Sequence, residues 1–160
     1  MATTLRRREA LSLVSLVPLL TEARGEGFAV GAFDVLTLEG AEAVVEVAEE
    51  EHSPVIIAVA EQHLDVVRLE NMAPSLVEMA RRANVPVCLH LDHGVSLSTI
   101  TRALRAGFSS VMFDGAALAF DENVARTAEL VRFCQPIGVT VETELGHIGA
   151  PGDEVVAEEM

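Results

Sequence analysis

The stretch Val85-Pro-Val-Cys-Leu-His-Leu-Asp-His-Gly94 decides the fold, because a nearly continuous apolar run ends there in a polar cluster and a glycine. Runs of this kind are typical of strands that are covered on both faces, as in a parallel sheet. Successive side chains of a strand alternate, so the two leucines should face one way and His90 and Asp92 the other. His93 then begins the turn at Gly94.

Similar apolar runs alternate with helical patterns along the chain. The five predicted strands are Phe28–Phe33, Val55–Val59, Val85–Leu91, Ser109–Phe113 and Val139–Val141. Helical spacing of apolar residues predicts helices over Leu38–Glu51, Leu64–Ala83, Leu97–Ala106 and Glu122–Cys134, with Ser96 as an N-cap and Gly107 as a C-terminal stop. This alternation predicts right-handed parallel crossovers and an α/β fold. The strands begin roughly 30 residues apart, so eight units would need about 250 residues, and five fit here.

Composition excludes several classes of function. The chain has no Lys, and 11 basic residues against 25 acidic ones give a net charge of −14. Such a charge repels phosphate backbones and anionic lipid surfaces, so we expect neither a nucleic-acid partner nor a membrane partner. Without an amine nucleophile, chemistry through a lysine Schiff base is also excluded.

The N-terminal segment has some features of a signal peptide. Three arginines, Arg6 to Arg8, precede the short apolar stretch Leu11–Leu20, but Glu9 and Pro18 interrupt the pattern. A helical stripe formed by Leu13, Leu16, Val17 and Leu20 favours an amphipathic leading helix within residues 1–24. We therefore expect a cytoplasmic protein, with export as the alternative.

His90, Asp92 and His93 close the third predicted strand, where parallel α/β folds gather their ligand sites. A neutral imidazole binds zinc, and a nearby carboxylate can exchange a proton with a polarised substrate, so the pair suits metal-assisted chemistry. The alternative is that both histidines are hydrogen-bonded strand residues and Asp92 caps the following helix. These three residues alone leave both interpretations open.

Five segments, taken in order, resemble one enzyme family. They are Gly31-Ala-Phe-Asp-Val35, Glu49-Glu-Glu-His-Ser-Pro-Val55, Val85-Pro-Val-Cys-Leu-His-Leu-Asp-His-Gly94, Ala106-Gly-Phe-Ser-Ser-Val-Met-Phe-Asp-Gly115 and Val141-Glu-Thr-Glu-Leu-Gly146. Over residues 25–150 the chain resembles the class II, zinc-dependent fructose- and tagatose-bisphosphate aldolases. The resemblance implies a TIM (β/α)₈ barrel of which this chain supplies about the first five βα units, and we expect residues 1–160 to form a single domain that is part of that barrel.

The resemblance also assigns roles to individual residues. It implies that Asp92 is the catalytic proton donor and acceptor and that His93 is a ligand of the catalytic zinc. It implies that Asp114 and Glu144 hold a second divalent metal, with ordinary polar residues at strand ends as the alternative. His90 is expected to be a core or supporting histidine, and the other histidines are expected at the surface or in loops: His52, His63 and His147.

The chain departs from the family pattern at several points. The family's other two zinc-binding histidines and its phosphate-binding glycine loops fall beyond Met160, so we expect an incomplete catalytic zinc site and weak or no activity for the chain as given. Asp34 and Ala60 replace the usual Asn and Ser, and the added carboxylate favours either a substrate without a second phosphate or an aldehyde half other than glyceraldehyde phosphate. In the following loop, Asp153 or Glu154 could replace the family's acidic residues.

The interpretation with most support is a zinc-dependent ketose-bisphosphate aldolase, a lyase of carbohydrate metabolism and glycolysis. It would reversibly cleave a phosphorylated ketose into dihydroxyacetone phosphate and an aldehyde, and it would form a homo-oligomer. One alternative is a non-catalytic barrel fragment that covers its unpaired strand edge by oligomerising or by binding another chain. Another is a phosphosugar-binding or isomerising barrel, since barrels host many chemistries.

Overall fold

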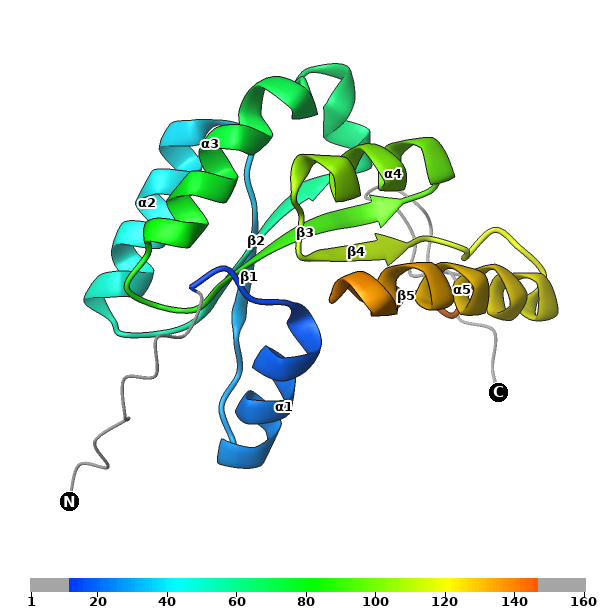
Figure 1. Ribbon diagram of the computed structural model, residues 1–160, viewed down its shortest axis with the longest axis horizontal. Helices are drawn as coiled ribbons and strands as arrows, with labels where there is room; N and C mark the ends of the chain where they lie inside the picture. Colours follow the sequence, from blue (N-terminus) through cyan, green and yellow to red (C-terminus); the bar gives the residue numbers. More distant parts are fainter. Residues whose placement is uncertain (1–11, 147–160) are drawn as a thin grey trace, which may run out of the picture.

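A computed structural model describes residues 12–146 as a parallel five-stranded sheet whose strands alternate with helices (Figure 1). The strands lie in the order β1-β2-β3-β4-β5, with every neighbouring pair parallel. Their bounds are Gly31–Asp34, Val55–Ala60, Val87–Gly94, Ser110–Phe113 and Thr140–Thr143. The predicted α/β class is confirmed, and sequential strand order is the order found in a (β/α)₈ barrel.

Helix α1 precedes the first strand, and one helix follows each of β1 to β4. They are α1 (Leu16–Glu26), α2 (Leu38–Glu50), α3 (Leu69–Arg82), α4 (Leu97–Ala106) and α5 (Phe120–Cys134), with short 3₁₀ turns η1 (Glu61–Asp65) and η2 (Gln135–Ile137). The caps of α4 are confirmed: the Ser96 side chain accepts a hydrogen bond from the Thr99 amide, and Gly107 ends the helix at φ 94°. Among residues 12–146, no helix is both long enough and apolar enough to cross a bilayer.

Two sides of the sheet have different partners. The outward side chains of β2 and β3, among them Ile57, Leu89 and Leu91, join one core with α2, α3 and α4. On the inner side, Ile56 and Cys88 form a smaller cluster with Leu16 and Leu19 of α1. In Figure 1, α1 accordingly lies across the strands from α2 and α3. The predicted alternation of β3 is confirmed, which leaves His90 and Asp92 on the inner side.

The edges of the sheet differ from the prediction that strands are covered on both faces. All six residues of β2 are buried, whereas the four residues of β1 are exposed and β5 is only partly covered. β1 and β5 have one neighbour each among the described strands, so no further strand shields their outer edges. A continuous apolar run therefore predicts burial correctly for the inner strands but not for the edge strands β1 and β5.

Two predicted helices are corrected. The pattern over Leu64–Ala83 is not one helix, because η1 ends at Asp65 and the extended Arg68 (φ −83°, ψ 108°) precedes α3. The leading helix spans Leu16–Glu26, while Leu13 pairs with Val87 as an isolated parallel bridge. The side chains that α1 buries are Leu16, Leu19 and Ala23, and the predicted Val17 and Leu20 are exposed. Residues 1–11 lie outside the described part of the chain.

Candidate metal and catalytic site

The site begins where β3 stops pairing regularly with β4. The register shifts between Leu91 and Gly94, and His93 takes a left-handed backbone conformation at φ 46°. A Cβ at Gly94 would lie 2.6 Å from the Met112 carbonyl oxygen, so only glycine lets the two strands approach this closely. Irregularities of this kind re-aim side chains at the ends of strands. Here the irregularity places the His93 imidazole at the carboxyl edge of the sheet.

His93, Asp114 and Glu144 form a compact cluster from three neighbouring strands. The His93 Nδ1 atom lies 2.9 Å from Asp114 Oδ2, within hydrogen-bond distance, and 3.7 Å from Glu144 Oε2. One ligand atom from each residue lies within 4.8 Å of the others. Imidazole nitrogen and carboxylate oxygen are the donors that zinc accepts, so the three side chains fit a divalent cation. The Asp114 hydrogen bond is the main reason that the pKa of His93 is raised.

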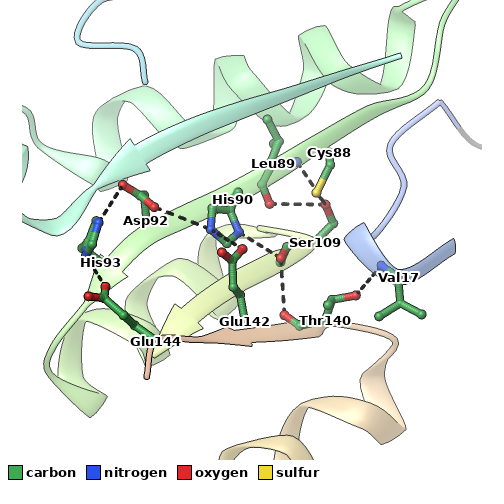
Figure 2. A network of polar contacts seen from close by, with 11 residues as sticks. Val17, Cys88, Leu89, His90, Asp92, His93, Ser109, Thr140, Glu142 and Glu144 are labelled. Atoms are coloured by element: carbon green, nitrogen blue, oxygen red, sulfur yellow. Dashed lines mark hydrogen bonds and ion pairs between the residues drawn. The ribbon is translucent and has the colours of Figure 1, made fainter. Parts of the chain in front are cut away.

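Asp92 lies on the other side of the same imidazole. Its Oδ2 atom is 3.9 Å from His93 Nε2, and Figure 2 shows His93 between Asp92 and Glu144. Burial raises the pKa of the Asp92 carboxyl, and the negative charge of Asp34 raises it further. A carboxyl with a raised pKa takes up and returns a proton more readily near neutral pH.

His90 is buried beneath these residues, as predicted for a core histidine. Its side chain is 5% exposed, and its Nδ1 atom lies 2.9 Å from Ser110 Oγ. The Nε2 atom lies 3.5 Å from Glu142 Oε2 and 3.9 Å from Asp92 Oδ1. Burial lowers the pKa of His90 from 6.5 to about 4, so the imidazole is neutral at physiological pH.

Comparison with known proteins decides the family. The family model for class II fructose-bisphosphate aldolase matches residues 14–160. The chain belongs to this family.

Several relatives share about two fifths of the chain's residues over most of its length. A protein of Bacillus subtilis named "Probable fructose-bisphosphate aldolase" is 41% identical over 154 residues, which cover 92% of this chain and 53% of the relative. The 6-phospho-5-dehydro-2-deoxy-D-gluconate aldolase of Halalkalibacterium halodurans is 38% identical, covering 91% and 52%. The crystal structure of the YdjI aldolase from Escherichia coli K12 aligns with a TM-score of 0.80 at 36% identity, over 84% of this chain and 52% of that one. The chain thus spans about half the length of the relatives it matches, and its five parallel strands with their helices are part of the family's TIM barrel.

The chain brings all four predicted site residues together at one edge of its sheet. Asp92 and His93 come from β3, Asp114 follows β4, and Glu144 follows β5. Of the other histidines, His52 is exposed, and His63 is partly buried with its Nδ1 atom lacking a hydrogen-bond partner among the described residues. His147, Asp153 and Glu154 lie outside the described residues.

Sequence reasoning missed Glu61, Ser110 and Glu142. The Glu61 carboxylate, at the end of β2, accepts hydrogen bonds from the amides of Val95 and Ser96, at 2.6 and 3.2 Å, just after the His93 turn. Glu142 has a raised pKa, first because of burial and then because of the charge of Asp92. Glu142 could have been predicted from the sequence, because it lies two residues before Glu144 and residues at that spacing share one face of a strand.

Proposed function

We propose that the protein to which this chain belongs is a zinc-dependent aldolase. It would reversibly cleave a phosphorylated ketose into dihydroxyacetone phosphate and an aldehyde, as a lyase of carbohydrate metabolism in the cytoplasm. The observation that carries the proposal is the placement of the His93 imidazole, with Nδ1 facing Asp114 and Glu144 and Nε2 facing Asp92. A cation-binding cluster thus lies beside a carboxyl of raised pKa.

The chain's own residues divide the work between holding a metal and moving a proton. His93 would be a ligand of the catalytic metal, and a bound zinc would supply Lewis-acid polarisation of the substrate's ketone. Asp92 would accept the proton of the hydroxyl that becomes the aldehyde carbonyl when the carbon–carbon bond breaks, and it would return that proton in the reverse direction. The partial burial of Asp92 limits the competition from bulk water for this proton.

A second metal is part of the proposal. Asp114 and Glu144 supply two carboxylates next to one imidazole. This donor set carries more negative charge than that of a catalytic zinc site with three neutral histidines. We propose that these acids hold a second divalent metal, and that further zinc ligands come from the half of the relatives' length that this chain does not match. The matched half alone would then be weakly active or inactive.

The substrate class follows from the charge at the rim of the site. Asp34, at the end of β1, is exposed and close enough for its charge to raise the pKa of Asp92. A carboxylate in that place repels a distal phosphate, and Ala60 offers no hydroxyl to bind one. Relatives are named for a bisphosphate and for a 6-phospho sugar acid, so the family includes both chemistries. We propose a ketose with a single phosphate.

The test uses the full-length protein that contains this chain. Release of dihydroxyacetone phosphate is followed for fructose bisphosphate, tagatose bisphosphate and singly phosphorylated ketoses, before and after chelation. We expect chelation to abolish cleavage and zinc to restore it. We expect Asp92→Asn to lose turnover while keeping its zinc, and His93→Ala to lose both. Cleavage that survives both substitutions would refute the assignment, and an exposed acid far from the site, as in Glu46→Gln, is the control.

Oligomerisation remains a second proposal, favoured by the exposed edge of the sheet. All of β1 is exposed, and Phe33, which is 50% exposed, lines a surface hollow together with Val44 and Val47 of α2. An open, apolar edge strand is normally paired or covered. We propose that further polypeptide covers it, either the rest of the barrel or a second copy in a homo-oligomer. Light scattering of the full-length protein at several concentrations separates a monomer from an assembly.

A further inference from the structure

A polar cluster on the inner side of the sheet has no part in holding the proposed metal. It consists of the buried His90 on β3, the buried Ser110 on β4 and the half-exposed Glu142 on β5, and it ends at Asp92. Figure 2 shows the His90 imidazole with contacts to both Asp92 and Glu142. His90 and Ser110 are both buried, so the orientation of these two side chains is determined by each other and by the neighbouring acids and hardly by water.

The contacts of His90 select one tautomer. Nε2 faces two carboxylates, at 3.5 Å from Glu142 and 3.9 Å from Asp92, and both distances are longer than an ordinary hydrogen bond. A lone pair on Nε2 would repel both acids in a buried site, whereas an N–H attracts both. A neutral imidazole carries only one ring proton, so a proton on Nε2 leaves Nδ1 as an acceptor.

Ser110 completes this assignment. Its Oγ atom lies 2.9 Å from His90 Nδ1 and 3.5 Å from the Thr140 carbonyl oxygen, and its single proton can serve only one of them. Because the carboxylates favour the proton on Nε2, Nδ1 is an acceptor, and the hydroxyl donates to it at 2.9 Å in preference to the longer contact with Thr140. This donation disfavours a proton on Nδ1 and holds the ring with its Nε2–H directed at the carboxylates. The neutral state agrees with the burial that lowers the pKa of His90.

The two oxygens of Asp92 face different histidines. Oδ1 lies 3.9 Å from His90 Nε2, and Oδ2 lies 3.9 Å from His93 Nε2. Attraction of Oδ1 to the His90 N–H therefore leaves Oδ2 directed at His93. Without that N–H, Asp92 and Glu142 would face each other as like charges and Asp92 would turn away.

Resting on the aldolase function proposed above, we propose that His90 is a positioning residue for Asp92. Ser110 fixes His90 as the Nε2–H tautomer, and this N–H lies between Asp92 and Glu142 and orients the Asp92 carboxylate towards the metal-binding edge of the site. His90 contacts neither the metal nor the substrate.

The first test needs no activity. Nitrogen-15 NMR of the full-length, zinc-loaded protein at neutral pH distinguishes the two neutral tautomers and the cation of a histidine, and His90→Gln identifies the resonance. We expect His90 as a neutral Nε2–H ring, and a mixture of tautomers in Ser110→Ala. A neutral Nδ1–H ring, a charged ring or a tautomer unchanged in Ser110→Ala would overturn the proposal.

The second test compares variants that keep or lose the donor. The amide nitrogen of Gln reaches about the place of Nε2, whereas that of Asn reaches about the place of Nδ1. We expect His90→Asn to lower kcat by about 10- to 100-fold, as for other supporting residues of metal sites, with KM and zinc content unchanged. We expect His90→Gln to restore most of kcat. Equal losses in both folded variants, or loss of zinc, would overturn the positioning role.

The two tests separate this proposal from the aldolase proposal. If the wild-type protein cleaves no phosphorylated ketose, the aldolase function fails, and the NMR result still decides the tautomer on which the positioning depends. If the wild type is active and His90→Asn is folded and equally active, only the positioning role fails.

Discussion

Replacing Glu61 with alanine should lower the free energy of unfolding by about 3 kcal/mol. The carboxylate accepts four hydrogen bonds: from the Val95 amide at 2.6 Å, the Ser96 amide at 3.2 Å, the Ser96 hydroxyl at 3.1 Å and the Thr99 hydroxyl at 2.7 Å. A hydrogen bond to a charged group contributes about 1.5–3 kcal/mol, and a carboxylate at a helix N-terminus adds about 0.3–1 kcal/mol. In the alanine variant, water can accept hydrogen bonds from the more exposed of these donors in place of the carboxylate. The expected loss of about 3 kcal/mol therefore corresponds to one hydrogen bond to a charged group plus the charge at the helix N-terminus.

Urea denaturation followed by circular dichroism measures this loss. Glu61→Gln should lose less than Glu61→Ala, because one carbonyl oxygen remains to accept, although its amide faces donors. Glu46→Ala is the matched control, since Glu46 is exposed on α2, and its change should stay within about 0.5 kcal/mol. A loss for Glu61→Ala no larger than the control's would refute the reasoning that this carboxylate fixes the segment after His93.

Three further predictions concern the same region. The pKa of His90 is about 4 in the folded protein and 6.5 ordinarily, so the unfolded chain takes up a proton at a higher pH than the folded chain does. The free energy of unfolding should therefore fall by about 3 kcal/mol as the pH drops from about 6.5 to about 4. Denaturation curves of His90→Gln should lack that fall. Asp114→Asn should lower the pKa of His93 towards its ordinary value in an NMR titration of the metal-free protein, because the hydrogen bond to Asp114 is the main cause of the rise; an unchanged pKa would contradict this. Gly94→Ala should destabilise the fold by about 1–3 kcal/mol, because its Cβ would meet the Met112 carbonyl at 2.6 Å, and an unchanged urea midpoint would show that the strands can separate.

The inner strands could be predicted from local sequence because their burial is nearly uniform. Every residue of β2 is buried, so its apolar run coincides with the strand to within one residue. β1 was predicted from Phe28 but begins at Gly31, where pairing with Val55 starts. Strand ends depend on the neighbouring strand, and a single apolar run does not carry that information.

The break before α3 illustrates the limit of periodicity. Leu64, Val67 and Leu69 continue the apolar spacing of a helix, yet the chain is extended at Arg68. Pro74 was the signal that the prediction did not use, because proline is best tolerated near the start of a helix. With α3 starting at Leu69, this residue lies in the second turn, whereas a helix from residue 64 would have placed it deep inside.

The site residues also fall into two groups, those that one local segment of sequence reveals and those that it does not. Asp92 and His93 could be found as a polar cluster at the end of one apolar run, whereas Asp114 and Glu144 were identified only through the family resemblance. Ser110 was missed because its contact with His90 depends on the pairing of β3 with β4, where the two residues are direct partners. Contacts between strands follow from register, which no single segment of the sequence reveals.

The central claim, that His93 holds a divalent metal beside Asp92, is tested most directly by anomalous diffraction at the zinc edge from crystals of the full-length protein grown with zinc. The account predicts a zinc peak about 2 Å from a ring nitrogen of His93, with carboxylate oxygens nearby and no peak at His90. A zinc peak held by other histidines while His93 points away, in a protein that cleaves a phosphorylated ketose, would contradict it.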